Sequence, residues 1–226
     1  MKQFMYRALL IAALSNTGCI MSHAAGRAAT QPANARVLAA VQNILTNAQS
    51  SRYSHKTTVD VEEGVFELDC SGLARILLLK AAPAALKELP VEKGQHRPLA
   101  ISFYNTFTNA ARPATGHWKE VPRLAEAGPG DFIAWRKQIQ VPGKTTGHVV
   151  ILISKPVREQ DGSFRVKVFD SSSTPHAQDS RMNSTGIGTG TMWFLADDSG
   201  RPVAFLWSAK SGKPTYCPIA IGRAAY

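Results

Sequence analysis

The sequence lacks several features that are typical of membrane-spanning, nucleic-acid-binding or metal-binding proteins. Beyond residue 25 it contains no run of the roughly 18 to 20 apolar residues that a membrane-spanning helix needs. Its lysines and arginines are scattered and never form a run of five, so binding to nucleic acid is not expected. Histidine, cysteine and acidic residues form no cluster at metal-ligand spacing, so the sequence predicts neither a metal site nor a cofactor.

An internal repeat and a phosphate-binding loop are also absent. The segment "GIGTG" at 186–190 is rich in glycine, but a β-rich run follows it and no helix does. A phosphate-binding loop has a helix in that place. We therefore interpret this segment as a tight loop beside a site, or as a bulge.

The overall composition is that of an ordinary globular protein. The chain has 226 residues, of which 44% are hydrophobic and 19% are charged. This supplies enough apolar side chains for a core. The length suits one domain with a leader better than two small domains.

The first 25 residues differ from the rest of the chain. A basic start with Lys2 and Arg7 is followed by the apolar run "ALLIAAL" and then by small and polar residues. This three-part layout predicts a signal peptide over residues 1–24. The sequence "NTGC" also leaves open a lipoprotein signal with a lipid anchor at Cys19. Both readings predict export, to the periplasm or the cell envelope.

Cleavage of this signal would leave a basic protein. The segment 25–35 is rich in Ala, Gly, Pro and Gln, and we expect a flexible leader there, before a domain at 36–226. The net charge falls from +10 to +8, because Lys2 and Arg7 are lost and no acid is. A basic exported protein is attracted to anionic polymers such as the cell wall.

Two cysteines, Cys70 and Cys217, remain after cleavage. In an oxidising compartment they could form a disulfide. If Cys70 acts as a free thiolate, that pairing is excluded. Cys217, in "PTYCPIAIG", is then interpreted as a buried small hydrophobic residue.

Helical patterns come first in the sequence and strand patterns come second. "ARVLAAVQNILTNAQ", the stretch from Ser71 to Lys80 and a segment after Pro98 have apolar residues at helical spacing, while residues 50–66 are polar and irregular. The later runs "DFIAW", "HVVILIS", "FRVKVFD", "TMWFLA" and "PVAFLW" alternate with turn signals. This order predicts an α+β fold in which N-terminal helices pack on an antiparallel sheet.

The stretch "VFELDCSGLARILLLK" places Cys70 at the start of one of these helices. Small residues follow the cysteine, and Leu73, Ile76 and Leu77 then recur at helical spacing. A helix N-terminus stabilises a thiolate through its dipole and its free N–H groups. The same N–H groups can hold an oxyanion during acyl transfer. The sequence thus predicts a nucleophilic cysteine.

A nucleophilic cysteine needs a base, and His148 is the best placed of the six histidines. It begins the apolar strand "HVVILIS", which can hold the imidazole still at the edge of a cleft. If the hairpin centre lies near residue 159, His148 faces Asp170 across the strand pair, and an acid there orients the imidazole. His176 is the alternative third residue, which we favour less because it lies beyond the strand end.

Three motifs in this order resemble the NlpC family of papain-like cell-wall cysteine peptidases. "LDCSGLAR" resembles the Asp-Cys-Ser-Gly motif of that family, "AGPGDFIAW" its Pro-Gly-Asp segment, and "TTGHVVILIS" its Gly-His-Val strand. The resemblance covers about residues 50 to 172. It implies a papain-like fold, with Cys70 as nucleophile, His148 as base and Asp170 as the third group. Tyr53, upstream of the cysteine, and Ser71 are expected to contact the substrate.

The chain departs from the family pattern in two places. The long spacing between "DCSG" and "PGD" indicates an inserted helical segment at about 83–128, which would shape the cleft. The tail from about 180 to 226 has no recognised counterpart.

The resemblance, the predicted export and the basic charge together indicate hydrolysis of amide bonds in peptidoglycan stem peptides. The basic residues that could form a rim around the cleft are Arg75, Arg97, Arg112, Lys119 and Arg136. The alternatives are an inactive cell-wall binding or interaction module, and an amidase or acyltransferase acting on another substrate.

Overall fold

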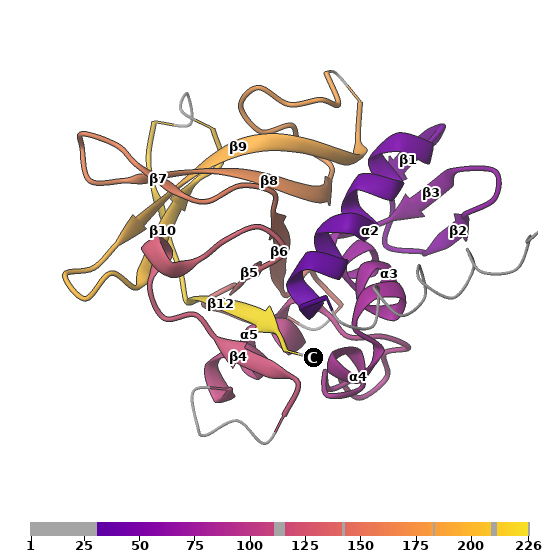
Figure 1. Ribbon diagram of the computed structural model, residues 1–226, viewed down its shortest axis with the longest axis horizontal. Helices are drawn as coiled ribbons and strands as arrows, with labels where there is room; N and C mark the ends of the chain where they lie inside the picture. Colours follow the sequence, from indigo (N-terminus) through magenta and orange to yellow (C-terminus); the bar gives the residue numbers. More distant parts are fainter. Residues whose placement is uncertain (1–30, 111–115, 142, 183, 209–211, 226) are drawn as a thin grey trace, which may run out of the picture. The chain divides into compact units, whose positions relative to one another are not determined.

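The computed structural model describes residues 31–110, 116–141, 143–182, 184–208 and 212–225. From Pro32 onward the chain folds as one unit (Figure 1). The predicted signal peptide, the possible lipid anchor at Cys19 and most of the predicted leader lie outside the described residues.

Four α-helices and a 3-10 turn are described. They are α2 (Ala33–Asn47), α3 (Cys70–Ala81), α4 (Pro83–Lys87), α5 (Ala100–Asn109) and η1 (Leu124–Glu126). α2 begins inside the segment 25–35, which corrects the predicted boundary of the leader; Ala35 and Arg36 there donate backbone hydrogen bonds to the carbonyl of Pro32. In the described part of the chain, no helix has both the length and the apolar character needed to cross a membrane.

A small sheet precedes the nucleophile helix, and the sequence did not reveal it. It consists of β1 (Ser50–Tyr53), β2 (Thr58–Asp60) and β3 (Val65–Leu68), with β3 between the other two. β1 pairs with β3 in parallel and β2 pairs with it in antiparallel fashion. The expectation of irregular structure at 50–66 is therefore wrong. β1 and β2 are short and half or more of their residues are exposed, so their polar side chains give no clear strand pattern.

The large sheet follows, and all its strand pairs are antiparallel. Its strands are β4 (Trp118–Glu120), β5 (Phe132–Arg136), β6 (Gly147–Leu152), β7 (Val157–Arg158), β8 (Phe164–Ser172), β9 (Gly186–Ala196), β10 (Pro202–Leu206), β11 (Thr215–Tyr216) and β12 (Ile219–Ala224). The order is β11-β10-β9-β8-β6-β5-β12-β4, and β7 pairs with β8. The predicted α+β fold with an antiparallel sheet is confirmed.

Alternating side chains give this sheet two buried faces. Val149 and Ile151 of β6 belong to the core shared with α2, α3 and α5. Val150 and Leu152 belong to a second core on the opposite face, where β8, β9 and β10 also contribute. α3 packs against β6 and β8, and this contact brings the start of α3 to the strands that carry the predicted base and acid.

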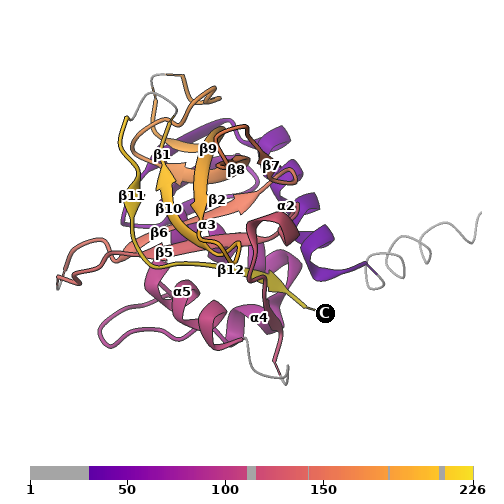
Figure 2. The same cartoon turned by 90° about the vertical axis from the view of Figure 1, so that its left-hand side faces the viewer.

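The segment at about 83–128 is only partly helical. It contains α4 and α5, but it also contains β4, which pairs with β12 at the edge of the large sheet. α5 packs on β5 and β12, and Figure 2 shows α4 and α5 together below these strands. Trp118 of β4 is buried and donates its indole N–H to the carbonyl of Ala85 at 2.8 Å. The segment therefore joins the main core.

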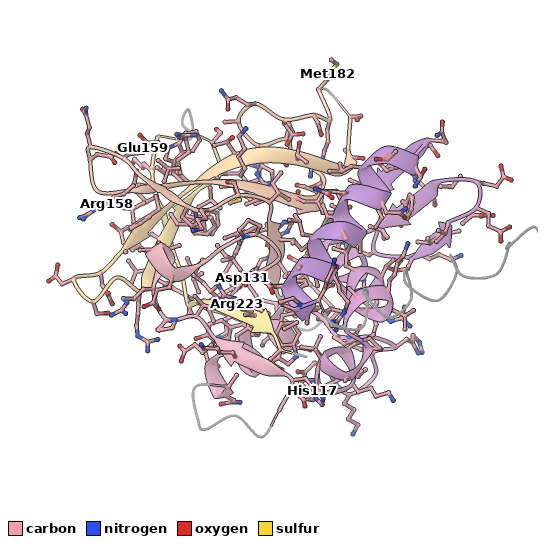
Figure 3. The ribbon with its side chains drawn as sticks, viewed as in Figure 1. His117, Asp131, Arg158, Glu159, Met182 and Arg223 are labelled. Carbon is pink, nitrogen blue, oxygen red and sulfur yellow. The ribbon has the colours of Figure 1, made fainter. Side chains whose placement is uncertain are left out.

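Asp131 of the Pro-Gly-Asp segment, just before β5, forms an ion pair with Arg223 of the neighbouring strand β12. Its two carboxylate oxygens accept hydrogen bonds from Nε and Nη2 of Arg223 on β12, both at 2.7 Å, and Oδ2 also accepts from Gly128 N–H at 2.8 Å. Asp131 is fully buried, and Figure 3 shows it beside Arg223. The residue has a structural role in this fold.

We predict that Asp131→Asn lowers the free energy of unfolding by about 2 to 4 kcal/mol, because it leaves Arg223 without its anion. The value lies toward the lower end for buried pairs, since the Arg223 side chain is 32% exposed. Urea unfolding of the two proteins measures the change. An unchanged midpoint would show that the pair contributes no net stability.

Candidate active site

Cys70 is the first residue of α3, and its neighbours hold the helix start in place. The Asp69 side chain caps the helix, with Oδ1 accepting from Gly72 N–H at 2.8 Å and from Ser71 Oγ at 3.0 Å. Cys70 itself is 5% exposed and forms no disulfide. The first-turn amides of a helix favour negative charge. The predicted position of Cys70 at a helix N-terminus is confirmed.

His148 and Asp170 lie together, as the hairpin argument predicts. His148 Nε2–H donates to Asp170 Oδ2 at 2.6 Å, and the Asp170 side chain is fully buried. The register differs from the prediction, however. Ile151 pairs with Phe169, so the pairing extends to place residue 150, rather than 148, opposite Asp170. A shift of two residues keeps both side chains on one face, and the contact is therefore diagonal.

Burial and charge set the protonation states of this pair. Burial lowers the pKa of His148, but the Cys70 charge and hydrogen bonds with Asp170 and Cys70 outweigh it and raise this pKa to about 10. Burial raises the pKa of Asp170, yet hydrogen bonds from His148 and His176 hold it well below its usual range. Asp170 is thus an ionised acceptor. With Nε2–H bound to it, the other ring nitrogen of His148 is left for Cys70.

We predict that the imidazole of His148 titrates near pH 10 and that Cys70→Ala lowers this midpoint, because the Cys70 charge is the largest cause that raises the pKa. The folded value lies above the ordinary 6.5. Protonated His148 therefore stabilises the fold fully below about pH 6.5, and this contribution is lost as the pH rises through about 10. NMR titration of the ring protons in both proteins measures the shift. Equal midpoints would place Cys70 out of contact with His148.

Asp170 has two further buried partners, His176 and Arg181. His176 Nε2 lies 3.0 Å from Asp170 Oδ2, and Arg181 Nη2 forms an ion pair with Oδ1. From the sequence, Asp170 and His176 are alternatives for the third residue of the triad. In the structure, Asp170 lies between His148 and His176 and contacts both. Arg181 was missed altogether. The "GIGTG" segment could have indicated it, because these glycines lie on β9 directly beside Asp170. The segment does lie beside the site, but it belongs to a regular part of β9, so its interpretation as a tight loop or a bulge is wrong.

A cavity of about 510 Å³ opens beside the nucleophile. Tyr53, Cys70 and Ser71 line it, so the two residues expected to contact the substrate lie in the same cavity as the predicted nucleophile. Burial, followed by the charges of Cys70 and Asp69, raises the pKa of Tyr53, so its hydroxyl stays protonated and can donate a hydrogen bond. His55 and Asp69 also line the cavity. Residues from two loops complete the wall, namely Glu92, Gln95, Arg97, Leu99, Ala100 and Ile101 before and within α5 and Gln140, Val141, Gly143, Lys144, Thr145, Thr146 and Gly147 before and at β6.

Most of the predicted basic rim does not reach this cavity. Arg97 does line it, but its Nη2 binds Asp69 Oδ2 at 2.7 Å and its Nη1 donates to Ser71 Oγ at 2.6 Å. The Arg136 guanidinium instead lies over the ring of Tyr104, at 5.4 Å. Of the other candidates, Arg75 lies on α3, Lys119 lies on β4, and Arg112 is outside the described residues. Lys144, which was not predicted, lines the cavity.

Cys217 lies apart from the site. It packs against the second core as a small hydrophobic residue, but it is only partly buried, less than the sequence predicted. Burial raises the pKa of its thiol to about 11, which keeps it protonated at neutral pH. Cys217 therefore serves as an internal reference for the chemistry of Cys70.

Searches for similar proteins add no family to this picture. No family model, curated protein or solved structure matches the chain.

Proposed function

We propose that this protein is a papain-like cysteine peptidase of the NlpC type that hydrolyses amide bonds in peptidoglycan stem peptides. The observation that carries the proposal is the constellation of a cysteine at a helix N-terminus and a histidine bound to a buried carboxylate. A thiolate, an imidazolium and an orienting acid are the three parts that acyl transfer by cysteine requires. The three motifs that resemble the family support the same assignment.

The reaction follows from these parts. The Cys70 thiolate attacks the amide carbon, and the N–H groups at the start of α3 stabilise the oxyanion. His148 gives its proton to the leaving amine as the C–N bond breaks, which leaves an acyl thioester on Cys70. His148 then takes a proton from water, the resulting hydroxide attacks the thioester, and the acid is released with regeneration of the thiolate. Asp170 keeps the imidazole oriented throughout.

The substrate class is supported by the cavity and by the predicted export. Stem peptides are compact and carry both amide bonds and free carboxylates. The cavity beside Cys70 contains polar donors and the cations Arg97 and Lys144, and it is bounded by two loops. Within this class, we place cleavage of the D-Glu to diamino-acid bond first and cleavage of the cross-link second. Export to the cell envelope brings such an enzyme to its substrate.

A side-by-side assay tests the proposal. The mature protein and its Cys70→Ala variant are incubated with a muropeptide mixture and with casein, and the products are read by mass spectrometry. We expect cleaved muropeptides and intact casein with the mature protein, and no products with the variant. Cleavage of casein alone would mean a general protease. Retention on cell-wall sacculi without cleavage would mean an inactive binding module.

A further inference from the structure

A buried polar cluster lies directly behind Asp170, in the connection between β8 and β9. Besides their contacts with Asp170, its members bind one another: Arg181 Nη1 donates to Asp179 Oδ2 at 2.6 Å, and the same oxygen accepts from the His176 backbone N–H at 2.7 Å. The side chains of His176 and Arg181 are fully buried. Both oxygens of Asp170 therefore have buried donors in addition to His148.

Glycines on β9 provide the space for this cluster. A Cβ atom at Gly188 would lie 2.5 Å from Cγ of Arg181, and one at Gly190 would lie 2.6 Å from Cβ of His176. Gly188 is the residue that pairs with Asp170 in the sheet register. Because side chains alternate along a strand, glycine at every second position leaves one face of β9 bare. The two buried side chains lie across that face and reach Asp170.

Arg181 is held by hydrogen bonds from its guanidinium and from its backbone N–H. Its Nε donates to the Gly186 carbonyl at 2.7 Å, and its Nη2 donates to the Asp170 carbonyl at 2.9 Å. Its backbone N–H also binds Asp179 Oδ1, at 2.8 Å. A guanidinium held in this way has one position, and it imposes that position on the carboxylate that it binds.

The ring of His176 packs against Trp207, and one of its two nitrogens is hydrogen-bonded. Its ring lies 4.3 Å from that of Trp207, whose indole N–H binds the Pro175 carbonyl at 3.1 Å. Since Asp170 is ionised, Nε2–H of His176 is the donor to it. Nδ1 has no hydrogen-bond partner among the described residues. A buried polar atom without a partner is costly, so the contact at Nε2 must offset that cost.

We propose that His176 and Arg181 are positioning residues for catalysis, which act on His148 through Asp170. The inference rests on the proposed role of Cys70, His148 and Asp170. Arg181 fixes Oδ1, and His176 shares Oδ2 with His148, so the carboxylate cannot rotate away from the imidazole. The ring of His148 is then held with its second nitrogen toward Cys70. Loss of either donor frees Asp170 and loosens the imidazole.

The alternative is a cluster that only stabilises the fold. In that case its loss would lower the melting temperature and leave the chemistry of the folded molecules unchanged. Two readouts separate the possibilities, and neither needs a substrate. One is the rate of iodoacetamide addition to Cys70 relative to Cys217. The other is the downfield proton resonance of His148 Nε2–H, whose exchange with water reports its hydrogen bond to Asp170.

Four variants provide the comparison. His176→Phe keeps an aromatic ring and loses the donor, whereas His176→Gln can place an amide N–H near the position of Nε2. Gly188→Ala introduces a Cβ that displaces Arg181 and changes no polar side chain. Thr189→Ala is the matched control, because it makes a small change at the next position of the same strand, on the opposite face.

We expect His176→Phe and Gly188→Ala to lower the Cys70 to Cys217 alkylation ratio by about ten- to a hundredfold, the scale of a misplaced catalytic group. The His148 Nε2–H resonance should broaden in both. His176→Gln should recover much of the ratio, and Thr189→Ala should match the unmodified protein. A folded His176→Phe protein with the original ratio and resonance would overturn the proposal. Failure of the mature protein to cleave muropeptides would contradict the proposed function and not this inference, since both readouts would still be measured.

Discussion

Cys70→Ser is expected to reduce kcat/KM on a cleaved muropeptide by about a thousandfold or more, because nucleophile removal in such triads costs several orders of magnitude. Serine is close in size to cysteine, and the helix start around it depends on Asp69, Ser71 and Gly72 rather than on the thiol. The fold should therefore survive. Steady-state hydrolysis, with melting temperature as a check on folding, measures the effect.

The matched control is Cys217→Ser, the same substitution at the other described cysteine. Cys217 is partly buried and lies outside the cavity of Cys70, so hydrolysis should stay within about twofold of the original rate. Iodoacetamide should label Cys70 much faster than Cys217 at neutral pH, since burial raises the pKa of the Cys217 thiol to about 11. If Cys70→Ser kept full activity, the triad would be wrong.

Individual helices and strands of this fold could be predicted from the sequence, because each is specified by residues within its own segment. The helix after Cys70 was predicted over Ser71 to Lys80, and the structure has it over Cys70–Ala81. An acid before the cysteine and an apolar spacing after it are enough to define that element. The runs that became β5, β6, β8 and β10 are equally clear, because β-branched and aromatic residues fill both sides of strands with two buried faces.

The pairing of strands that are far apart in the chain could not be predicted from the sequence. β12 comes from the C-terminal tail, yet it lies between β5 and β4 in the sheet. It also provides Arg223, the ion-pair partner of Asp131. Nothing in its six residues specifies that position. The register of β6 and β8 was likewise two residues away from the hairpin estimate. The prediction of the His148 contact survived, because an even shift preserves the face on which a side chain lies.

The same distinction applies to the candidate site, where some residues could be predicted from the sequence and others could not. Cys70 and His148 were found from local patterns, and Asp170 from the estimated pairing of two strands that follow each other in the chain. Arg97 was expected on a rim, but it lies in the wall of the cavity, bound to Asp69. The sequence cannot show that a loop some 28 residues away supplies the counter-ion of a helix cap. Arg181 was missed for a similar reason, since its partner Asp170 lies on another element.

Asp170→Asn is the change that should separate orientation from simple burial. Asparagine keeps the shape of the side chain but has one acceptor oxygen and one amide group. Arg181 needs an acceptor at the position of Oδ1, so the oxygen of the substituted side chain is expected to face Arg181 and its NH₂ group to face Nε2 of His148. Nε2 must then be an acceptor, and the ring proton moves to the nitrogen that faces Cys70. Such a ring cannot take a proton from the thiol.

The expected loss in kcat/KM for Asp170→Asn is about 10³- to 10⁴-fold, the scale known for a triad whose histidine is held in the wrong tautomer. The pKa of His148 should also fall, because the hydrogen bond and the charge of Asp170 are among the causes that raise it. The ¹⁵N shifts of the ring nitrogens identify the tautomer directly. Asp131→Asn is the matched control, since Asp131 is equally buried and arginine-bound but lies away from the cavity. It should lose stability and keep its turnover per folded molecule. If both variants lost activity only in proportion to unfolding, Asp170 would be a structural residue and the base would be oriented by something else.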